Sequence, residues 1–292
     1  MTTVMIGFAL LFGLTTFALW PAKGKKPPML PELIPFLSNT YQFAANMNTF
    51  IPRLRRSLEN SNIVGFYLAG MRIDFEMFFL VGIINVMGAT PDDVAKFAGD
   101  KSGRLATPLP GTENTPQEQR YLHTMHSIMH KYLSQTQYAN GLAVIYERFF
   151  LEELDEHFPH GESKVTGIYS LIKQHMTKAA ILSLQGRHIF RFAPGVVDLF
   201  WEYDKVITTT MFGPPKWMFP KQYAIAERYC GAMARYLQDA NASFDWNGPD
   251  AEADWEPIFG ARFTRKLAKW MNQSGFSPRT QGGFGAVVGM MA

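Results

Sequence analysis

Three histidines recur at helical spacing near the middle of the chain: His123, His126 and His130. At i, i+3 and i+7 they share one face of a helix, and neutral imidazoles so placed can bind zinc or iron. In the metal-protease helix a glutamate directly follows the first histidine, whereas here Thr124 stands at that position. We therefore expect a solvated or partly buried histidine face. The alternative is a metal-dependent hydrolase built on the three histidines, which stoichiometric zinc would support.

The single cysteine, Cys230, is the second group with reactive chemistry. It lies in a helical pattern, and Arg228 two residues earlier is the kind of neighbour that lowers the pKa of a thiol. A lone helical cysteine more often packs as a small apolar side chain, and we expect that role. One cysteine also excludes an internal disulfide and a multi-cysteine zinc site, as suits a reducing compartment.

Gly283 and Gly285 have the spacing that opens a dinucleotide-binding loop. No predicted strand precedes them, and Val288 stands in place of the third glycine. No nucleotide site is therefore expected. The uncharged residues 280–292 instead predict the start of a buried helix, with a glycine-rich tail as the alternative.

Helices must position these groups, because the hydrophobic period is helical almost throughout the second half of the chain. Turn residues rich in Pro and Gly separate the helical stretches. The predicted helices span 41–60, 116–136, 139–156, 165–185, 194–211, 220–240 and 257–273.

A single strand signal comes early in the chain. Residues 63–70 and 71–76 flank a glycine turn, and the second arm alternates apolar with charged side chains, which predicts a hairpin. Thr90 followed by Pro91 and two aspartates predicts a capped helix start. Residues 99–117, rich in Gly, Pro, Thr and Ser, predict a long loop. The expected fold class is mainly α with one small early β hairpin.

The N-terminus predicts a membrane anchor. Residues 2–20 carry no charge, and as a helix they span about 28 Å, close to the thickness of a bilayer core. A cleaved signal peptide is the alternative, but it would begin with a basic residue and end in small residues, not in Trp20-Pro21. Lysines follow the run and none precedes it, which places the body on the cytosolic side. Five prolines between positions 21 and 35 predict a stiff spacer.

These features divide the chain into a transmembrane anchor at 1–20, a basic, proline-rich hinge at 21–40 and a body at 41–292. The net charge is only +3, and no basic stripe follows any predicted helix, so nucleic acid is not an expected partner. A hydrophobic content of 47% suits a chain that buries a large core or exposes an apolar face to a membrane.

Together these parts resemble the N-terminal half of microsomal cytochrome P-450 monooxygenases, notably fungal members. The stretches that carry the resemblance follow the family's order: the lead and proline hinge, the first β pair, the third helix, the helices after it and the approach to the central helix that crosses the haem. They are residues 1–43, 63–76, 120–142, 171–215 and 275–292.

The resemblance implies an incomplete cytochrome P-450 fold that stops near the start of the central helix. The family's Gly-x-[Asp/Glu]-Thr-Thr turn, its Glu-x-x-Arg pair and its Phe-x-x-Gly-x-x-x-Cys-x-Gly haem loop do not occur in the 292 residues. By position Cys230 is not the haem ligand. We therefore expect no catalytic residue and no metal ligand here, and haem, the family's cofactor, is not expected to be held by this chain alone.

The resemblance also suggests haem propionate contacts. The family's third helix presents a Trp-x-x-x-Arg pair to a propionate, whereas the nearest alignment here gives Leu122-x-x-x-His126, with His130 and Lys131 one turn on. A cationic histidine or lysine at these positions would contact the propionate weakly. His126, His130 and Lys131 are therefore the candidate cofactor-binding residues.

By this resemblance a full-length relative oxidises a small lipophilic substrate, using haem, O₂ and electrons from a flavoprotein reductase. It sits in the endoplasmic reticulum membrane with a single pass and a cytosolic body. The alternative is a membrane-tethered, non-enzymatic binding protein derived from the same fold, which a monodisperse, folded preparation would favour over aggregation.

Overall fold

The computed structural model describes residues 66–68, 71–73, 83–158, 167–211 and 215–290. The predicted anchor, the hinge and the helix at 41–60 lie outside these residues. No helix within the described ranges is long and apolar enough to cross a membrane. The chain falls into two compact units, residues 1–79 and 80–292.

In the first unit, β1 (Phe66–Leu68) pairs antiparallel with β2 (Met71–Ile73). In this register Phe66 is the backbone partner of Ile73 and Leu68 that of Met71. This confirms the hairpin at its centre. The outer parts of the two predicted arms lie beyond the described residues.

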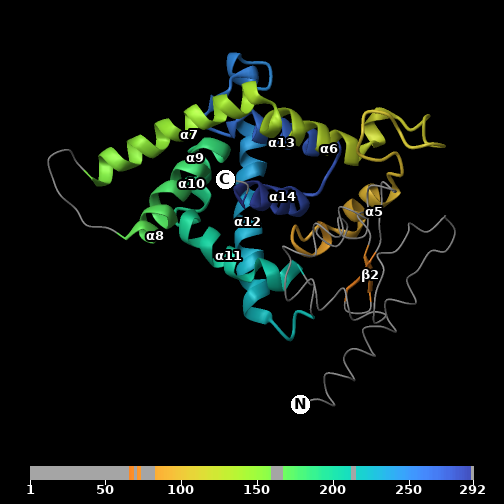
Figure 1. The fold of residues 1–292 in the computed structure, drawn as a ribbon, viewed down its shortest axis with the longest axis horizontal. Coiled ribbons are helices and arrows are strands. Elements are labelled where there is room, and N and C mark those ends of the chain that lie inside the picture. Colours follow the sequence, from red (N-terminus) through yellow and green to blue (C-terminus); the bar gives the residue numbers. More distant parts are fainter. Residues whose placement is uncertain (1–65, 69–70, 74–82, 159–166, 212–214, 291–292) are drawn as a thin grey trace. The chain divides into compact units, whose positions relative to one another are not determined.

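The second unit is helical, as predicted (Figure 1). Apart from two short strands, β3 and β4, its elements are α helices, short 3₁₀ turns and two π-helical stretches. In order they are α5 (Pro91–Gly99), η2 (Gln117–Gln119), α6 (Tyr121–Met129), η3 (His130–Ser134, π), α7 (Thr136–His157), α8 (Ile168–Leu171), η4 (Ile172–Met176, π), α9 (Thr177–Gln185), α10 (Ile189–Phe192), α11 (Val196–Met211), α12 (Pro220–Ser243), η5 (Pro249–Glu252), β3 (Trp255–Glu256), β4 (Gly260–Ala261), α13 (Arg262–Gln273) and α14 (Pro278–Met290).

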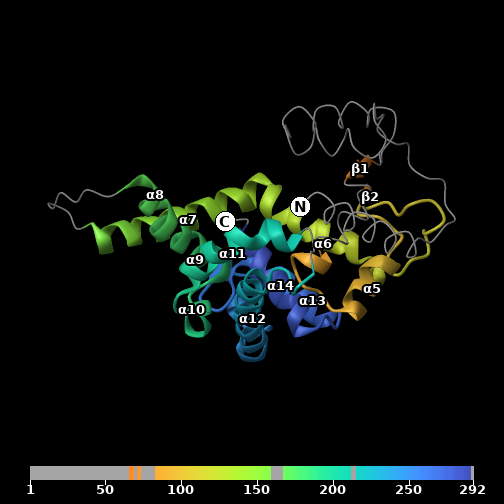
Figure 2. The same ribbon diagram turned by 90° about the horizontal axis from the view of Figure 1, so that it is seen from below.

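Helix α12 is the centre of the core. It packs against α14, α11 and α10, and both ribbon views show α14 beside it (Figures 1 and 2). Its buried face carries Tyr229, Met233 and Tyr236, each with no exposed surface, and Tyr203 of α11 packs on Tyr229 with ring centroids 5.0 Å apart. These aromatic side chains bury large apolar areas, which is the main stabilising term for such a core.

The glycine-rich end of the chain forms helix α14 and is buried, as predicted. At Gly282 a Cβ would lie 2.8 Å from the backbone nitrogen of Ala234 in α12, and at Gly283 it would overlap the carbonyl oxygen of Met87. The glycines therefore let α14 approach its neighbours more closely than any side chain would allow. This close packing is why the segment is a helix and not a tail.

Three predicted helices differ from the structure. The helix expected at 165–185 is divided into α8, the π-helical η4 and α9. The helix expected at 116–136 is divided into a 3₁₀ turn, α6 and the π-helical η3. The helix expected from residue 257 begins only at Arg262, because β3 and β4 form a tight hairpin before it. There the Glu256 carboxylate accepts hydrogen bonds from the backbone N–H groups of Ile258 (2.7 Å) and Phe259 (2.6 Å), which fixes the turn.

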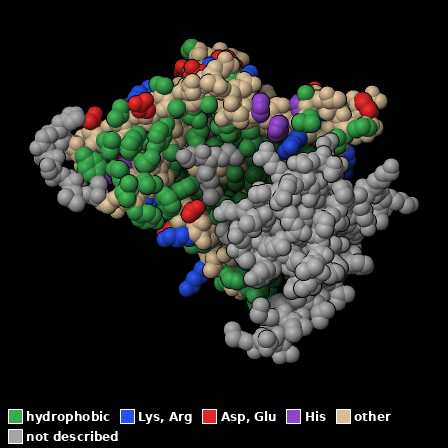
Figure 3. Space-filling model, in the orientation of Figure 1, with side chains coloured by type: hydrophobic (Ala, Val, Ile, Leu, Met, Phe, Trp, Pro, Cys, Tyr) green, Lys and Arg blue, Asp and Glu red, His purple; other side chains and the backbone are tan. Residues whose placement is uncertain are grey.

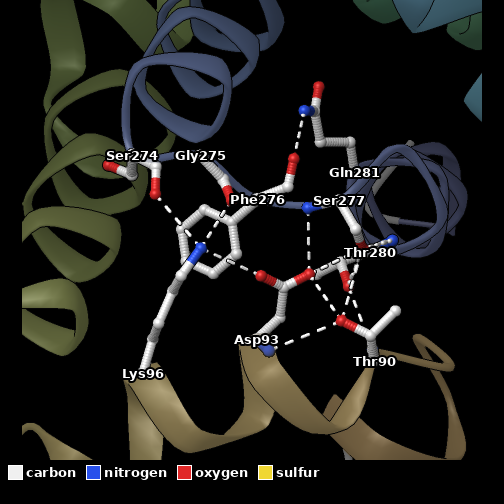
Figure 4. A network of polar contacts seen from close by, with 9 residues as sticks. All are labelled: Thr90, Asp93, Lys96, Ser274, Gly275, Phe276, Ser277, Thr280 and Gln281. Carbon is white, nitrogen blue, oxygen red and sulfur yellow. Dashed lines mark hydrogen bonds and ion pairs between the residues drawn. The ribbon is translucent and has the colours of Figure 1, made fainter.

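A polar network joins α5 to the segment between α13 and α14 (Figure 4). Thr90 caps α5, as predicted, and its hydroxyl donates to Asp93 Oδ2 at 2.9 Å. Ser277 donates to the same oxygen from its hydroxyl (2.6 Å) and from its backbone N–H (2.9 Å), and Lys96 Nζ lies 3.0 Å from Oδ1. Burial alone would raise the pKa of Asp93, but the hydrogen bonds from Ser277, Thr280 and Lys96 outweigh it and hold that pKa well below its usual 3.8.

We expect Asp93→Asn to lower the free energy of unfolding by about 1–3 kcal/mol at neutral pH, because buried donors lose a charged acceptor. The pKa of Asp93 is lower in the folded chain than in the unfolded chain. Its contribution is therefore complete above the unfolded value of about 4 and is lost as the pH falls below it. Urea unfolding of the purified chain between about pH 7 and pH 2 measures this. The exposed neighbour Asp92→Asn is the control, and an equal loss in both variants at every pH would contradict the prediction.

Candidate functional site

The predicted histidine face lies on α6 and η3, where histidine side chains reach the surface (Figure 3). His126 and His130 stack with ring centroids 6.0 Å apart. His123 turns elsewhere, with its Nδ1 3.2 Å from the carbonyl oxygen of Arg104 and its Nε2 3.5 Å from the Ser127 hydroxyl. The π-helical turn that begins at His130 changes the helical spacing at this point. The structure thus brings two of the three histidines together and leaves the third in a loop contact.

The surroundings of His126 disfavour its positively charged form. Burial lowers the pKa of His126, and the positive charges of Arg104, His130 and His123 lower it further. A histidine held largely neutral binds a carboxylate less well than a cation does. The contact of His126 with a haem propionate stays a prediction. Its lowered pKa weakens that contact, because the imidazole is mostly uncharged at neutral pH.

Lys131 contacts other residues than the two stacked histidines do. Its Nζ lies 5.3 Å from the ring centroid of Tyr132 and 5.7 Å from that of Tyr138, within cation–π range. It also lines a hollow of about 340 Å³ between α6–η3 and α13, which His126 and His130 do not line. The residues around this hollow are Ser127, Ile128, Lys131, Tyr132, Lys266, Lys269, Trp270 and Gln273.

Cys230 lies in the core on α12 and is 6% exposed. Burial raises the pKa of its thiol to about 11, with Glu227 raising it and Arg279 lowering it. Arg228, the sequence neighbour of the kind that lowers a thiol pKa, pairs with Glu202 instead. The thiol therefore stays protonated at neutral pH and packs among the apolar side chains of the core, which is the role expected for it. Enclosed in this core, Cys230 does not fit the thiolate ligand of a haem site.

One cluster was missed by reasoning from the sequence. Glu153 and His157 of α7 and His175 of η4 place a carboxylate oxygen and two imidazole nitrogens within 4.8 Å of one another. The spacing of Glu153 and His157, i and i+4, was visible in the sequence and puts both on one helix face. Nothing local indicated that His175 would join them.

Comparison with known proteins decides the family relationship. No family model matches the chain. Over 278 residues it is 34% identical to a protein named cytochrome P450 monooxygenase calL from Penicillium decumbens, an alignment that covers 89% of this chain and 51% of the relative. Over 273 residues it is 22% identical to cytochrome P450 monooxygenase fsoE from Humicola fuscoatra, covering 87% of this chain and 45% of the relative. The chain is a partial homologue of fungal cytochrome P450 monooxygenases.

The resemblance seen in the sequence is thereby confirmed as partial homology to fungal cytochrome P450 monooxygenases. The chain spans about half the length of the curated P450 relatives it matches. The mainly helical second unit and the small antiparallel hairpin agree with a partial P450-like fold. Haem is the cofactor that the P450 family implies for those relatives.

Proposed function

We propose that this chain forms the N-terminal half of a membrane-anchored haem-thiolate monooxygenase. The observation that carries the proposal is the 34% identity over 89% of the chain, matched to only 51% of a P450 monooxygenase. The order of the described elements supports the assignment to the N-terminal half, since a small hairpin comes first among them and a buried helix, α14, comes last. By its family such an enzyme oxidises a small lipophilic molecule with O₂.

The proposed location is the endoplasmic reticulum membrane, with one pass at residues 1–20 and the body on the cytosolic side. The uncharged run at 2–20 and the lysines at 23, 25 and 26 support it. A flavoprotein reductase is the proposed electron donor, by analogy with the family.

The oxidation itself needs a thiolate from outside these 292 residues. When haem is bound through such a ligand, it supplies the activation of O₂. Within the described residues Cys230 is a protonated core thiol, so it does not provide this ligand. The contribution proposed for this chain is the membrane mount and the helical framework around α12 and α14.

The test is the absorption spectrum of the purified chain after addition of haem, reduction and treatment with CO. We expect no Soret band at the position typical of thiolate-ligated haem. Cys230→Ala is the control: a thiolate band that appears in the parent chain and vanishes in this variant would make Cys230 the ligand and overturn the proposal. The same spectrum from a protein that continues through a cysteine loop should show the band.

A further inference from the structure

Glu153, His157 and His175 form a compact group where η4 packs beside α7. Oε2 of Glu153 lies 3.8 Å from Nδ1 of His157 and 3.6 Å from Nδ1 of His175. The two imidazole rings lie 4.6 Å apart between centroids. Nδ1 of His157 is also 3.0 Å from the main-chain oxygen of Glu153, to which its N–H donates. This bond holds the ring beside the carboxylate, and a metal bound through Nδ1 would replace it.

The carboxylate at the centre is buried and half satisfied. Glu153 is 4% exposed. Its Oε1 pairs with Lys178, whereas its Oε2 has no hydrogen-bond donor and points toward the two imidazoles. A buried carboxylate oxygen without a partner is costly, and a bound ion is one of the explanations for such an atom in a native structure. This orphan oxygen is independent of the clustering of the three side chains, and it indicates a cation at the same place.

The donor set selects the kind of cation. Two imidazole nitrogens and one carboxylate oxygen suit a borderline transition ion, zinc above all, and suit Ca²⁺ or Mg²⁺ poorly. Bonds of about 2.0–2.1 Å in a tetrahedral site place ligand atoms roughly 3.3–3.4 Å apart. The observed 3.6 and 3.8 Å exceed this by a few tenths of an ångström, which small side-chain rotations close.

The exposure of the ligands leaves room for entry and for a fourth ligand. The side chain of His157 is 38% exposed and that of His175 is 16% exposed, so one side of the group meets solvent. A water can complete the coordination from that side. We propose that Glu153, His157 and His175 bind one Zn²⁺, which joins the end of α7 to η4. The site does not depend on haem and so goes beyond the proposed monooxygenase function.

Lys178 is expected to lower the affinity of the site for zinc. Its ammonium group pairs with Oε1 of Glu153 and lies 3.9 Å from the Glu156 carboxylate. This positive charge repels a cation on the other carboxylate oxygen. Lys178→Met should therefore tighten zinc binding, which is the opposite of what removing a ligand does.

The test is calorimetric titration of Zn²⁺ into the full chain in detergent after chelation, together with thermal unfolding with and without zinc. We expect one equivalent to bind and to raise the Tm. His157→Ala removes a partly exposed ligand without opening the core. This variant and, separately, Glu153→Gln should each weaken zinc binding by at least about tenfold. His126→Ala/His130→Ala is the matched control, since it removes two histidines outside the group, and it should leave the affinity unchanged.

Three results would overturn the proposal: no stoichiometric binding by the parent chain, unchanged binding in His157→Ala, or loss of binding in the His126/His130 control. If Glu153→Gln does not fold by circular dichroism, His157→Ala alone still decides the question. The Co²⁺-loaded chain adds a spectroscopic check. Its visible absorption should indicate four-coordinate nitrogen and oxygen ligands and should change in His157→Ala.

Discussion

Glu256→Ala should lower the free energy of unfolding by about 3–5 kcal/mol, because it leaves a charge buried without a counter-ion. Arg265, the partner of Glu256, has no exposed surface, and its Nη1 lies 3.4 Å from Oε1 of the carboxylate. Burial lowers the pKa of the Arg265 guanidinium, and Glu256 opposes that shift. The same carboxylate accepts the backbone N–H groups of Ile258 and Phe259, which would also lose their acceptor.

The measurement is urea unfolding of the purified chain, followed by circular dichroism. Glu252→Ala is the matched control, since Glu252 pairs with Lys266 across the same turn but is 68% exposed. An exposed pair contributes at most about 1 kcal/mol, so the control should change little. Similar losses in the two variants would show that the buried pair is not exceptional. The double variant Glu256→Ala/Arg265→Met should lose less than the sum of its parts, because it removes the stranded charge.

Gly283→Ala should destabilise the chain by roughly 2–3 kcal/mol, although alanine is the better helix former. A Cβ at this position of α14 would overlap the carbonyl oxygen of Met87 and would lie 2.5 Å from its carbonyl carbon. The obstacle is backbone, which cannot rotate away as a side chain does. Helix α14 would have to shift, and its contacts with α12 would loosen.

Gly141→Ala is the control with the opposite expected sign. Gly141 lies inside α7, and a Cβ there would meet nothing within 4 Å. Alanine should therefore stabilise the chain by about 0.5–1 kcal/mol through helix propensity alone. Thermal and urea unfolding of both variants compare the two effects. Stabilisation by Gly283→Ala would show that α14 does not pack closely on the segment at Met87.

Much of the helical framework was predictable because its signals are local. Thr90 and Pro91 mark the start of α5, and the apolar period between the prolines near residues 215 and 249 marks α12. Caps, proline positions and a period of 3.6 residues act over a few neighbouring residues, so the chain alone reveals them. The hairpin of β3 and β4, which the helical period did not predict, depends on neighbours far along the chain. Gly260 illustrates this, because a Cβ there would meet the backbone of Leu184, Gln185 and Gly186.

The candidate sites depended more on distant contacts. Arg228 stands two residues before Cys230, yet it pairs with Glu202 and burial raises the pKa of the thiol to about 11. Cys230 therefore has the packing role expected of it. The three histidines of α6 shared a spacing, yet the close group is the one formed by Glu153, His157 and His175. Spacing along one helix is a local property, whereas ligand sets usually come from two elements.

The histidine spacing, the lone cysteine, the uncharged N-terminal run and the order of the motifs were determined by the sequence itself. The order of the motifs sufficed to indicate the partial homology to P450 monooxygenases. The tertiary structure alone decided which of these groups meet and which are buried. Helix packing brings His175 to Glu153 and seals Cys230 within the core around α12 and α14. Protonation and metal affinity follow burial and the charges nearby in space, and these arise only when distant segments pack together.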